Sequence, residues 1–226
     1  MTRFLALLML ALASPTVAAP RNFTITSFDR IRMEAPFEVS VTTGKAPSAR
    51  ADGPVSALDT VDLRVEGRTL IIRQRSGWNG AGKGVPVRIS LGTPDLRAAS
   101  LIGSGRLLID RMGGLSVNLG LAGPGQLKVA DLRSDRVELL AGGSGTVTLA
   151  GAVKTGRIGA EGSIVLDAAA LQAEQLVIVA AGSAEVRASA RRSVNLTASA
   201  AAIVALQNPV PCTQRVTGAA TVTNCR

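Results

Sequence analysis

A short glycine-rich turn recurs along the second half of this sequence, and each copy precedes a run in which apolar and polar residues alternate. The clearest copies begin at Gly103, Gly123 and Gly143, and weaker ones follow toward the C-terminus. With the position of Gly105 as marker, the copies fall at residues 105, 125, 145, 162, 184, 201 and 220, at intervals of 20, 20, 17, 22, 17 and 19. A period of about 20 residues is typical of stacked repeats, in which each unit buries its apolar face against its neighbours.

A second alternating run lies before each turn, as at 115–121, 136–140, 176–179 and 193–197. Period-two alternation predicts strands with one buried face, so each repeat holds two short strands joined by a tight corner. The sequence therefore predicts an all-β, single-stranded β-helix, or β-solenoid, with about 20 residues per coil and right-handed winding. Glycine suits the corners because it adopts positive φ and allows close packing at little cost.

The composition agrees with a narrow core. Histidine and tyrosine are absent, and aromatic residues make up only 2% of the chain. A large globular core normally uses more aromatic rings, whereas thin layers of Val, Leu, Ile and Ala need few.

The first half of the chain is less regular but contains similar runs. Strands are expected at 23–26, 37–41, 61–65, 69–73 and 85–91, with a single helical turn at 55–59. We expect one continuous domain over 20–226, in which an N-terminal β region (20–100) starts and caps the regular coils (101–226). A cap is needed because the end of a solenoid otherwise exposes an apolar face and unpaired strand edges.

Residues 1–19 have the features of a secretory signal peptide, with Arg3, an apolar run at 4–13 and small residues at 16–19. The run is shorter than the roughly 20 residues that span a bilayer, and no later stretch is apolar enough to do so. The sequence thus predicts an exported protein, located in the periplasm or at the cell surface, without a transmembrane segment.

The formal net charge is +9, and the arginines that produce it are scattered along the chain. Such scatter indicates a solvated basic surface. The more specific alternative is a surface that binds an anionic partner, such as a glycan or a lipid head group. Nucleic acid is not expected, because no basic cluster lies beside stacking aromatics. The expected partners are an anionic envelope polymer or another envelope protein.

The polar loop at 76–84 imitates the glycine spacing of a phosphate-binding loop. Gly84 stands where a Ser or Thr should hold magnesium, and a strand follows where a helix should begin. Nucleotide binding is therefore not expected. Trp78, Asn79 and Lys83 are instead candidate contact residues on an exposed loop.

No metal or cofactor site is expected. The run at 142–147 resembles a calcium-binding β-roll repeat, but Val147 replaces the required aspartate. Histidine is absent, and two cysteines are too few for a zinc cluster.

The densest mixture of charges contains Asp131, Asp135 and Glu138 together with Arg133 and Arg136. A polysaccharide-cleaving β-helix would use such residues, but at a turn between strands they are expected to form a solvated corner. No catalytic residue is assigned, and the chain is not expected to be an enzyme.

Cys212 and Cys225 lie near the C-terminus and are the chain's two cysteines. In an exported protein they are expected to form an intramolecular disulfide. The bond would staple the terminal coil.

The glycine-serine-glycine corners, the run at 37–41 and the run at 70–72 resemble the putative auto-transporter adhesin head GIN domain family, over about 23–222. The chain departs from that pattern where Ala184, Ala201 and Ala220 replace corner glycines. The resemblance implies a secreted bacterial β-helical protein without an established biochemical activity. The leading expectation is a non-catalytic, adhesin-like binding or structural module of the cell envelope. A polysaccharide-active enzyme and an end-to-end oligomer are the alternatives.

Overall fold

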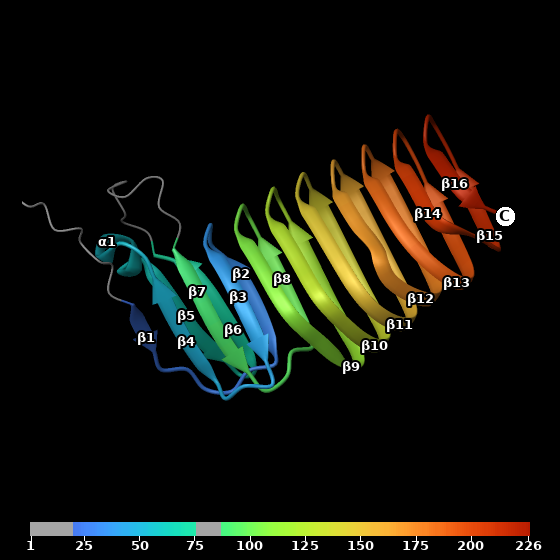
Figure 1. The fold of residues 1–226 in the computed structure, drawn as a ribbon. Helices are drawn as coiled ribbons and strands as arrows, with labels where there is room; N and C mark the ends of the chain where they lie inside the picture. The colour runs from blue at the N-terminus through green and yellow to red at the C-terminus, as the bar shows by residue number, and fades with distance from the viewer. Residues whose placement is uncertain (1–19, 76–86) are drawn as a thin grey trace, which may run out of the picture.

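The structure is a computed structural model that describes residues 20–75 and 87–226. Its strands belong to one 16-stranded sheet that winds into a solenoid (Figure 1). The predicted signal peptide, 1–19, lies outside the described residues. The N-terminal elements are β1 (Arg21–Phe23), β2 (Arg30–Glu34), β3 (Glu38–Thr43), β4 (Ser48–Asp52), α1 (Val55–Leu58), β5 (Val61–Glu66), β6 (Thr69–Gln74), β7 (Arg88–Thr93) and β8 (Ala98–Ile102). The coils are formed by β9 (Arg106–Ala122), β10 (Gln126–Gly143), β11 (Thr146–Gly162), β12 (Val165–Gly182), β13 (Glu185–Ala198), β14 (Ile203–Val210), β15 (Cys212–Val216) and β16 (Thr221–Cys225).

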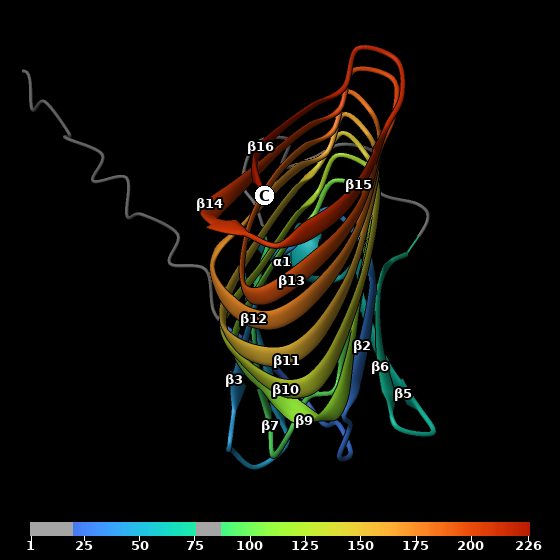
Figure 2. The same cartoon turned by 90° about the vertical axis from the view of Figure 1, so that its right-hand side faces the viewer.

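Each regular coil is one long strand that bends at a corner. The strands β9 to β12 are 17 or 18 residues long, and each pairs in parallel with the next along the stack. Figure 2, which looks along the stack, shows the coils lying behind one another. The solenoid with coils of about 20 residues is thus confirmed. The two short strands expected per coil are joined, because ladder pairing resumes directly after the bend.

The turn positions show where the predicted register was wrong. Hydrogen bonds between coils place Ile164 and Ala202, not residues 162 and 201, at the position of Gly105: Glu185 N–H donates to the Ile164 carbonyl as Gln126 N–H does to that of Gly105. The corrected series is 105, 125, 145, 164, 184, 202 and 220, with intervals of 20, 20, 19, 20, 18 and 18. The error arose because the coil at Ile164 keeps only the first corner glycine, Gly162, and the coil at Ala202 has alanine at both positions.

A column of positive φ values runs along the turn edge. Glycine occupies it in six coils, for example Gly143 at φ +106°, whereas Ala200 holds the position at φ +62°. A side chain there crowds the backbone at a cost of about 1–2 kcal/mol, while glycine adopts this conformation freely.

We therefore expect Ala200→Gly to stabilise the chain by about 0.5–1 kcal/mol, since part of the relief is offset by the greater freedom of glycine in the unfolded state. Ala201 is the control, because it is exposed in the same turn and has no positive φ. Ala201→Gly should leave the chain unchanged or slightly less stable in denaturant titrations. Equal effects of the two changes would contradict the strained-turn explanation.

The core is a stack of aliphatic layers. Along one inward column, Leu107, Leu127, Val147, Leu166 and Val186 are all fully buried, and the register places each opposite the next. Alternating residues point outward, as the predicted period of two requires. Each layer is thin, so the scarcity of aromatic residues fits the architecture.

The N-terminal end departs from parallel stacking. β2 pairs in parallel with β6 and β8, and β3 pairs in parallel with β7. The pairs β1–β4, β4–β7 and β5–β6 are antiparallel. The helical turn expected at 55–59 is present as α1. The strand expected at 23–26 lies earlier, as β1, and β2 and β4 were not predicted.

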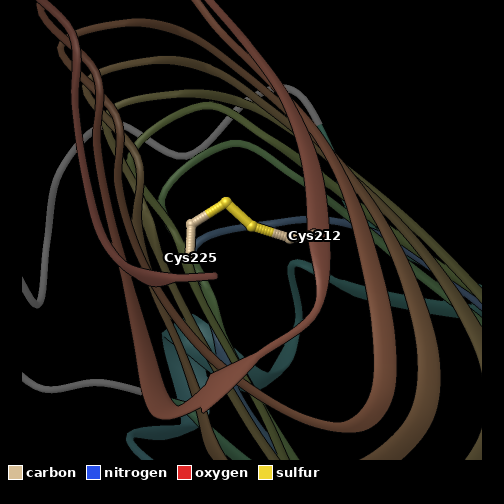
Figure 3. Close-up of a disulfide and its surroundings, with 2 residues drawn as sticks. All are labelled: Cys212 and Cys225. Carbon is tan, nitrogen blue, oxygen red and sulfur yellow. A yellow bond between two sulfur atoms is a disulfide. The ribbon is translucent and has the colours of Figure 1, made fainter.

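The opposite end is closed by the predicted disulfide between Cys212 and Cys225, whose Cα atoms are 5.5 Å apart. Figure 3 shows the two sulfurs between facing sides of the last coil. The chain end folds back here, because Cys212 N–H donates to the Arg226 carbonyl (2.9 Å) and Arg226 N–H to that of Val210 (3.1 Å). Asn224 Nδ2 also donates to the Leu206 carbonyl at 2.6 Å. The disulfide and these hydrogen bonds together hold the C-terminal residues against the last coil.

Candidate functional site

Four arginines gather on the outer face of β2, β5 and β6. The register places Arg64 and Arg32 on either side of Ile71, and Arg73 between Asp62 and Glu34. Arg75 follows β6 and reaches Asp62 at 3.5 Å. We call this group the arginine patch, and its members are Arg32, Arg64, Arg73, Arg75, Glu34 and Asp62.

Each carboxylate of the arginine patch is shared by two arginines. Glu34 accepts hydrogen bonds from Arg32 Nε (2.5 Å) and Arg73 Nε (2.7 Å). Asp62 accepts from Arg64 Nε at 3.2 Å and also faces Arg75. Four positive and two negative charges leave a net charge of +2. The carboxylates thereby hold the guanidinium groups in place without neutralising them.

The contact between Glu34 and Arg73 favours the charged forms of both groups. The hydrogen bond from Arg73 is the main cause that lowers the pKa of Glu34 below its ordinary value, and the same contact raises the pKa of Arg73. The contribution of this pair to stability is therefore present above the ordinary pKa of a glutamate and is lost as the pH falls through the lowered one. The arginine side chains are 47–65% exposed, so their remaining N–H donors face solvent.

An apolar groove of about 550 Å³ continues the same face across β8 to β12. Leu140, Val179 and Ile102 line it, with 58%, 42% and 39% of their surfaces exposed. Figure 1 shows these five strands side by side. The apolar groove is lined by Ser100, Ile102, Gly120, Leu121, Ala122, Leu140, Ala141, Gly142, Gly159, Ala160, Glu161, Val179 and Ala181.

Missing side chains hollow out the apolar groove. Gly120, Gly142 and Gly159 lie within strands and have no positive φ. A Cβ at Gly142 would meet nothing within 4 Å, and one at Gly120 would meet Ser100 Oγ at 3.4 Å. The backbone therefore does not require glycine at Gly120 or Gly142, whereas a Cβ at Gly159 would lie 3.1 Å from Leu140 Cδ2. Glycine inside a strand weakens the sheet and often marks a place where another group approaches closely.

The arginine patch and the apolar groove share a row of outward residues. Along it, Arg32 is the partner of Ser100, followed by Gly120, Leu140 and Gly159. Adjacent strands lie about 4.8 Å apart, so the arginines begin one strand away from the apolar groove. Polar and apolar surface therefore adjoin on the same outer face.

The charged corner that the sequence suggested is a network of exposed ion pairs. Asp131 contacts Arg133 at 3.1 Å and Arg111 at 3.4 Å, and Asp135 contacts Lys154 at 2.7 Å. The hydrogen bond to Asp135 is the main cause that raises the pKa of Lys154. This arrangement is the solvated corner expected from the sequence.

Other hollows lie outside this face. One of about 590 Å³ adjoins β1, β4 and β7 and includes Phe23 and Arg50. Another of about 450 Å³ lies along the charged corner, with Leu115 and Lys154 in its lining. Neither joins apolar surface to the arginine patch.

Part of the predicted site, the loop at 76–84, cannot be compared with the structure. Trp78, Asn79 and Lys83 lie outside the described residues. Within 20–75 and 87–226, no group of three or more potential metal-ligating His, Cys, Asp or Glu residues occurs. In the same part of the chain, no helix is long and apolar enough to cross a membrane.

The sequence did not single out the arginine patch. The alternation in Arg30–Glu34 was a possible signal for β2, since its polar positions are all charged. However, Glu34 and Arg73 are 39 residues apart, and only the pairing of β2 with β6 brings them together.

Several solved structures have a similar fold. A putative adhesin from Bacteroides fragilis NCTC 9343 matches with a TM-score of 0.76 and 15% identity, over 92% of this chain and 97% of that one. A putative adhesin from Parabacteroides merdae ATCC 43184 gives 0.69 and 16%, over 92% and 95%. A putative lipid binding protein from Parabacteroides distasonis ATCC 8503 gives 0.66 and 16%, over 92% and 96%.

Family membership follows from the sequence match. No curated protein matches the chain. The family model described as "Putative auto-transporter adhesin, head GIN domain" matches residues 27–209, which is most of the chain and includes both the arginine patch and the apolar groove. The resemblance noted from the glycine corners is confirmed, and the chain belongs to the auto-transporter adhesin head GIN domain family.

Proposed function

We propose that this protein is an exported, non-catalytic binding module of the bacterial cell envelope, which holds an anionic envelope polymer on the arginine patch. The observation that carries the proposal is the sharing of each carboxylate by two arginines on the outer face of the sheet. Arginine presents planar donors that match carboxylate, sulfate and phosphate groups. Fixing these donors in advance lowers the entropy lost on binding.

The family and the disulfide support the same proposal. Membership in an adhesin-domain family favours export and surface attachment, and a disulfide is typical of oxidising compartments outside the cytoplasm. Two similar structures carry the name adhesin, and a third is named for lipid binding. Anionic polymers and anionic lipid head groups share the chemistry that an arginine cluster recognises.

The ion pairs also favour binding over catalysis. Asp131 and Asp135 are the strongest acidic candidates in the sequence. Both form ion pairs with arginine or lysine side chains at an exposed corner. A glycosidase needs two carboxylates about 5–10 Å apart across a cleft that holds the sugar. We expect no release of reducing ends from polygalacturonate by the mature chain, and enzymatic depolymerisation would overturn this part of the proposal.

The test replaces Arg32 and Arg73 by glutamine and measures binding of the mature chain to immobilised polygalacturonate. Removing two charged donors should weaken binding at least about tenfold. Raising the salt concentration from about 0.05 M to about 0.5 M should weaken the unmodified chain in the same direction.

The matched control is Arg111→Gln with Arg133→Gln. These arginines also share one carboxylate, that of Asp131, so charge and local structure change equally at a different place. The control should retain most of the affinity. Equal losses in the two variants would show that only net charge matters and would contradict a site on the arginine patch.

A further inference from the structure

We infer that the apolar groove takes the acyl chain of an anionic amphiphile whose head group lies on the arginine patch. The inference rests on the proposed function for the head group and adds a second, apolar contact to it. The occupant is thus a single-chain anionic lipid, whose acyl chain lies perpendicular to the strands.

The shape of the surface favours an acyl chain over a flat bilayer. The apolar groove crosses five strands, from Ser100 on β8 to Val179 on β12, which is about 19 Å at the usual strand spacing. It is a hollow of about 550 Å³ between exposed aliphatic side chains. A bilayer surface is met by protruding apolar groups, whereas a hollow of this form accommodates a chain.

The charges favour one orientation of the amphiphile. Arg32 is the register partner of Ser100 at the β8 end, and Arg73 shares Glu34 with it. Glu161 lies exposed in the lining farther along, on β11. Arg157 flanks Gly159 on the other side in the same strand and offsets Glu161, so the excess of positive charge beside the apolar groove lies at the arginine patch. The head therefore lies over β2 and the tail runs toward Val179.

The glycines allow the apolar groove to be filled without disturbing the fold. Gly142 has room for a side chain, and Gly120 has nearly as much. Both have backbone conformations that any residue can adopt. The double change Gly120→Leu and Gly142→Leu should therefore block the apolar groove and leave the unfolding midpoint unchanged or raised.

The experiment titrates the mature chain with monomeric lysophosphatidylglycerol, below its micelle concentration. The groove-filling variant should bind at least about tenfold more weakly, and polygalacturonate binding should not change. The control Thr148→Leu adds the same side chain on an outward position of β11 outside the apolar groove, and it should bind as the unmodified chain does. Unchanged lysolipid affinity in the groove-filling variant would overturn the inference.

Further arms separate this inference from the proposed function. If the Arg32 and Arg73 variant loses polygalacturonate while the groove-filling variant keeps lysolipid, the acyl-chain inference alone is wrong. If the arginine variant binds lysolipid normally, the head group does not lie on the arginine patch. Binding to vesicles of phosphatidylglycerol without binding to monomeric lysolipid would instead indicate that the face docks on a bilayer.

Discussion

Gly151→Ala should cost about 3 kcal/mol of stability, because it combines backbone strain with overpacking. Gly151 has φ +130°, and a Cβ there would overlap the carbonyl oxygen of Leu132 and lie 2.5 Å from its amide nitrogen. The cause is a shortened corner: two residues separate Val129 from Leu132, but one separates Leu149 from Gly151, which pair with them. Only a residue without a side chain closes this gap. Denaturant titration followed by circular dichroism measures the loss.

Gly142→Ala is the control for that change. It lies on the neighbouring coil, has no positive φ, and offers open space for a Cβ. Its effect should stay within about 0.5 kcal/mol. If Gly151→Ala were equally mild, the bend between Leu149 and Val153 would have to relax, and the register shift would not be a fixed feature of the coil.

Replacing Cys212 and Cys225 by serine should cost about 3 kcal/mol, the value expected for closing a loop of this size. The loss should be local, because coils in a solenoid contact only their neighbours. The strands β15 and β16 each pair on one side, with β13 and β14, and most of their residues are exposed. Amide exchange should therefore accelerate in β15 and β16 and remain slow in β10.

The control for the disulfide is the unmodified chain under reducing conditions, which should show the same exchange pattern as the double serine variant. Uniform acceleration along all coils would contradict a local staple. No acceleration in β15 or β16 would show that the backbone contacts of Arg226 hold the end without the bond.

The fold was predictable because each repeat is marked by features of neighbouring residues, namely apolar–polar alternation and corner glycines. Alternation at 115–121 and 136–140 identified strands within β9 and β10, and the corner glycines identified the turns. The position of Ile164 was not predictable from glycine alone, since an apolar residue replaced the second corner glycine and points into the core, fully buried. The continuity of each strand around the bend was not predictable either, because sequence alternation breaks where a register shift occurs.

The candidate site was less accessible to sequence reasoning. Scattered arginines were recognised as a basic surface, but the arginine patch depends on the pairing of β2 with β6, whose paired residues are 39 positions apart in the chain. The apolar groove was hidden for a similar reason: Gly120, Leu140 and Gly159 are each about one coil apart and resemble ordinary strand residues in isolation. Composition led to the expectation of an anionic partner, whereas the register of the strands determines where the arginine patch and the apolar groove lie.

The crosswise course of the apolar groove has a consequence for specificity. Each of the five strands contributes two or three residues to its lining, and each strand belongs to a separate repeat of about 20 residues. Inserting one whole coil between β11 and β12 would lengthen the hollow by a single strand spacing, about 4.8 Å, and leave the arginine cluster untouched. If the proposed lipid lies in the apolar groove, the number of coils sets the length of acyl chain that fits, independently of the arginine patch.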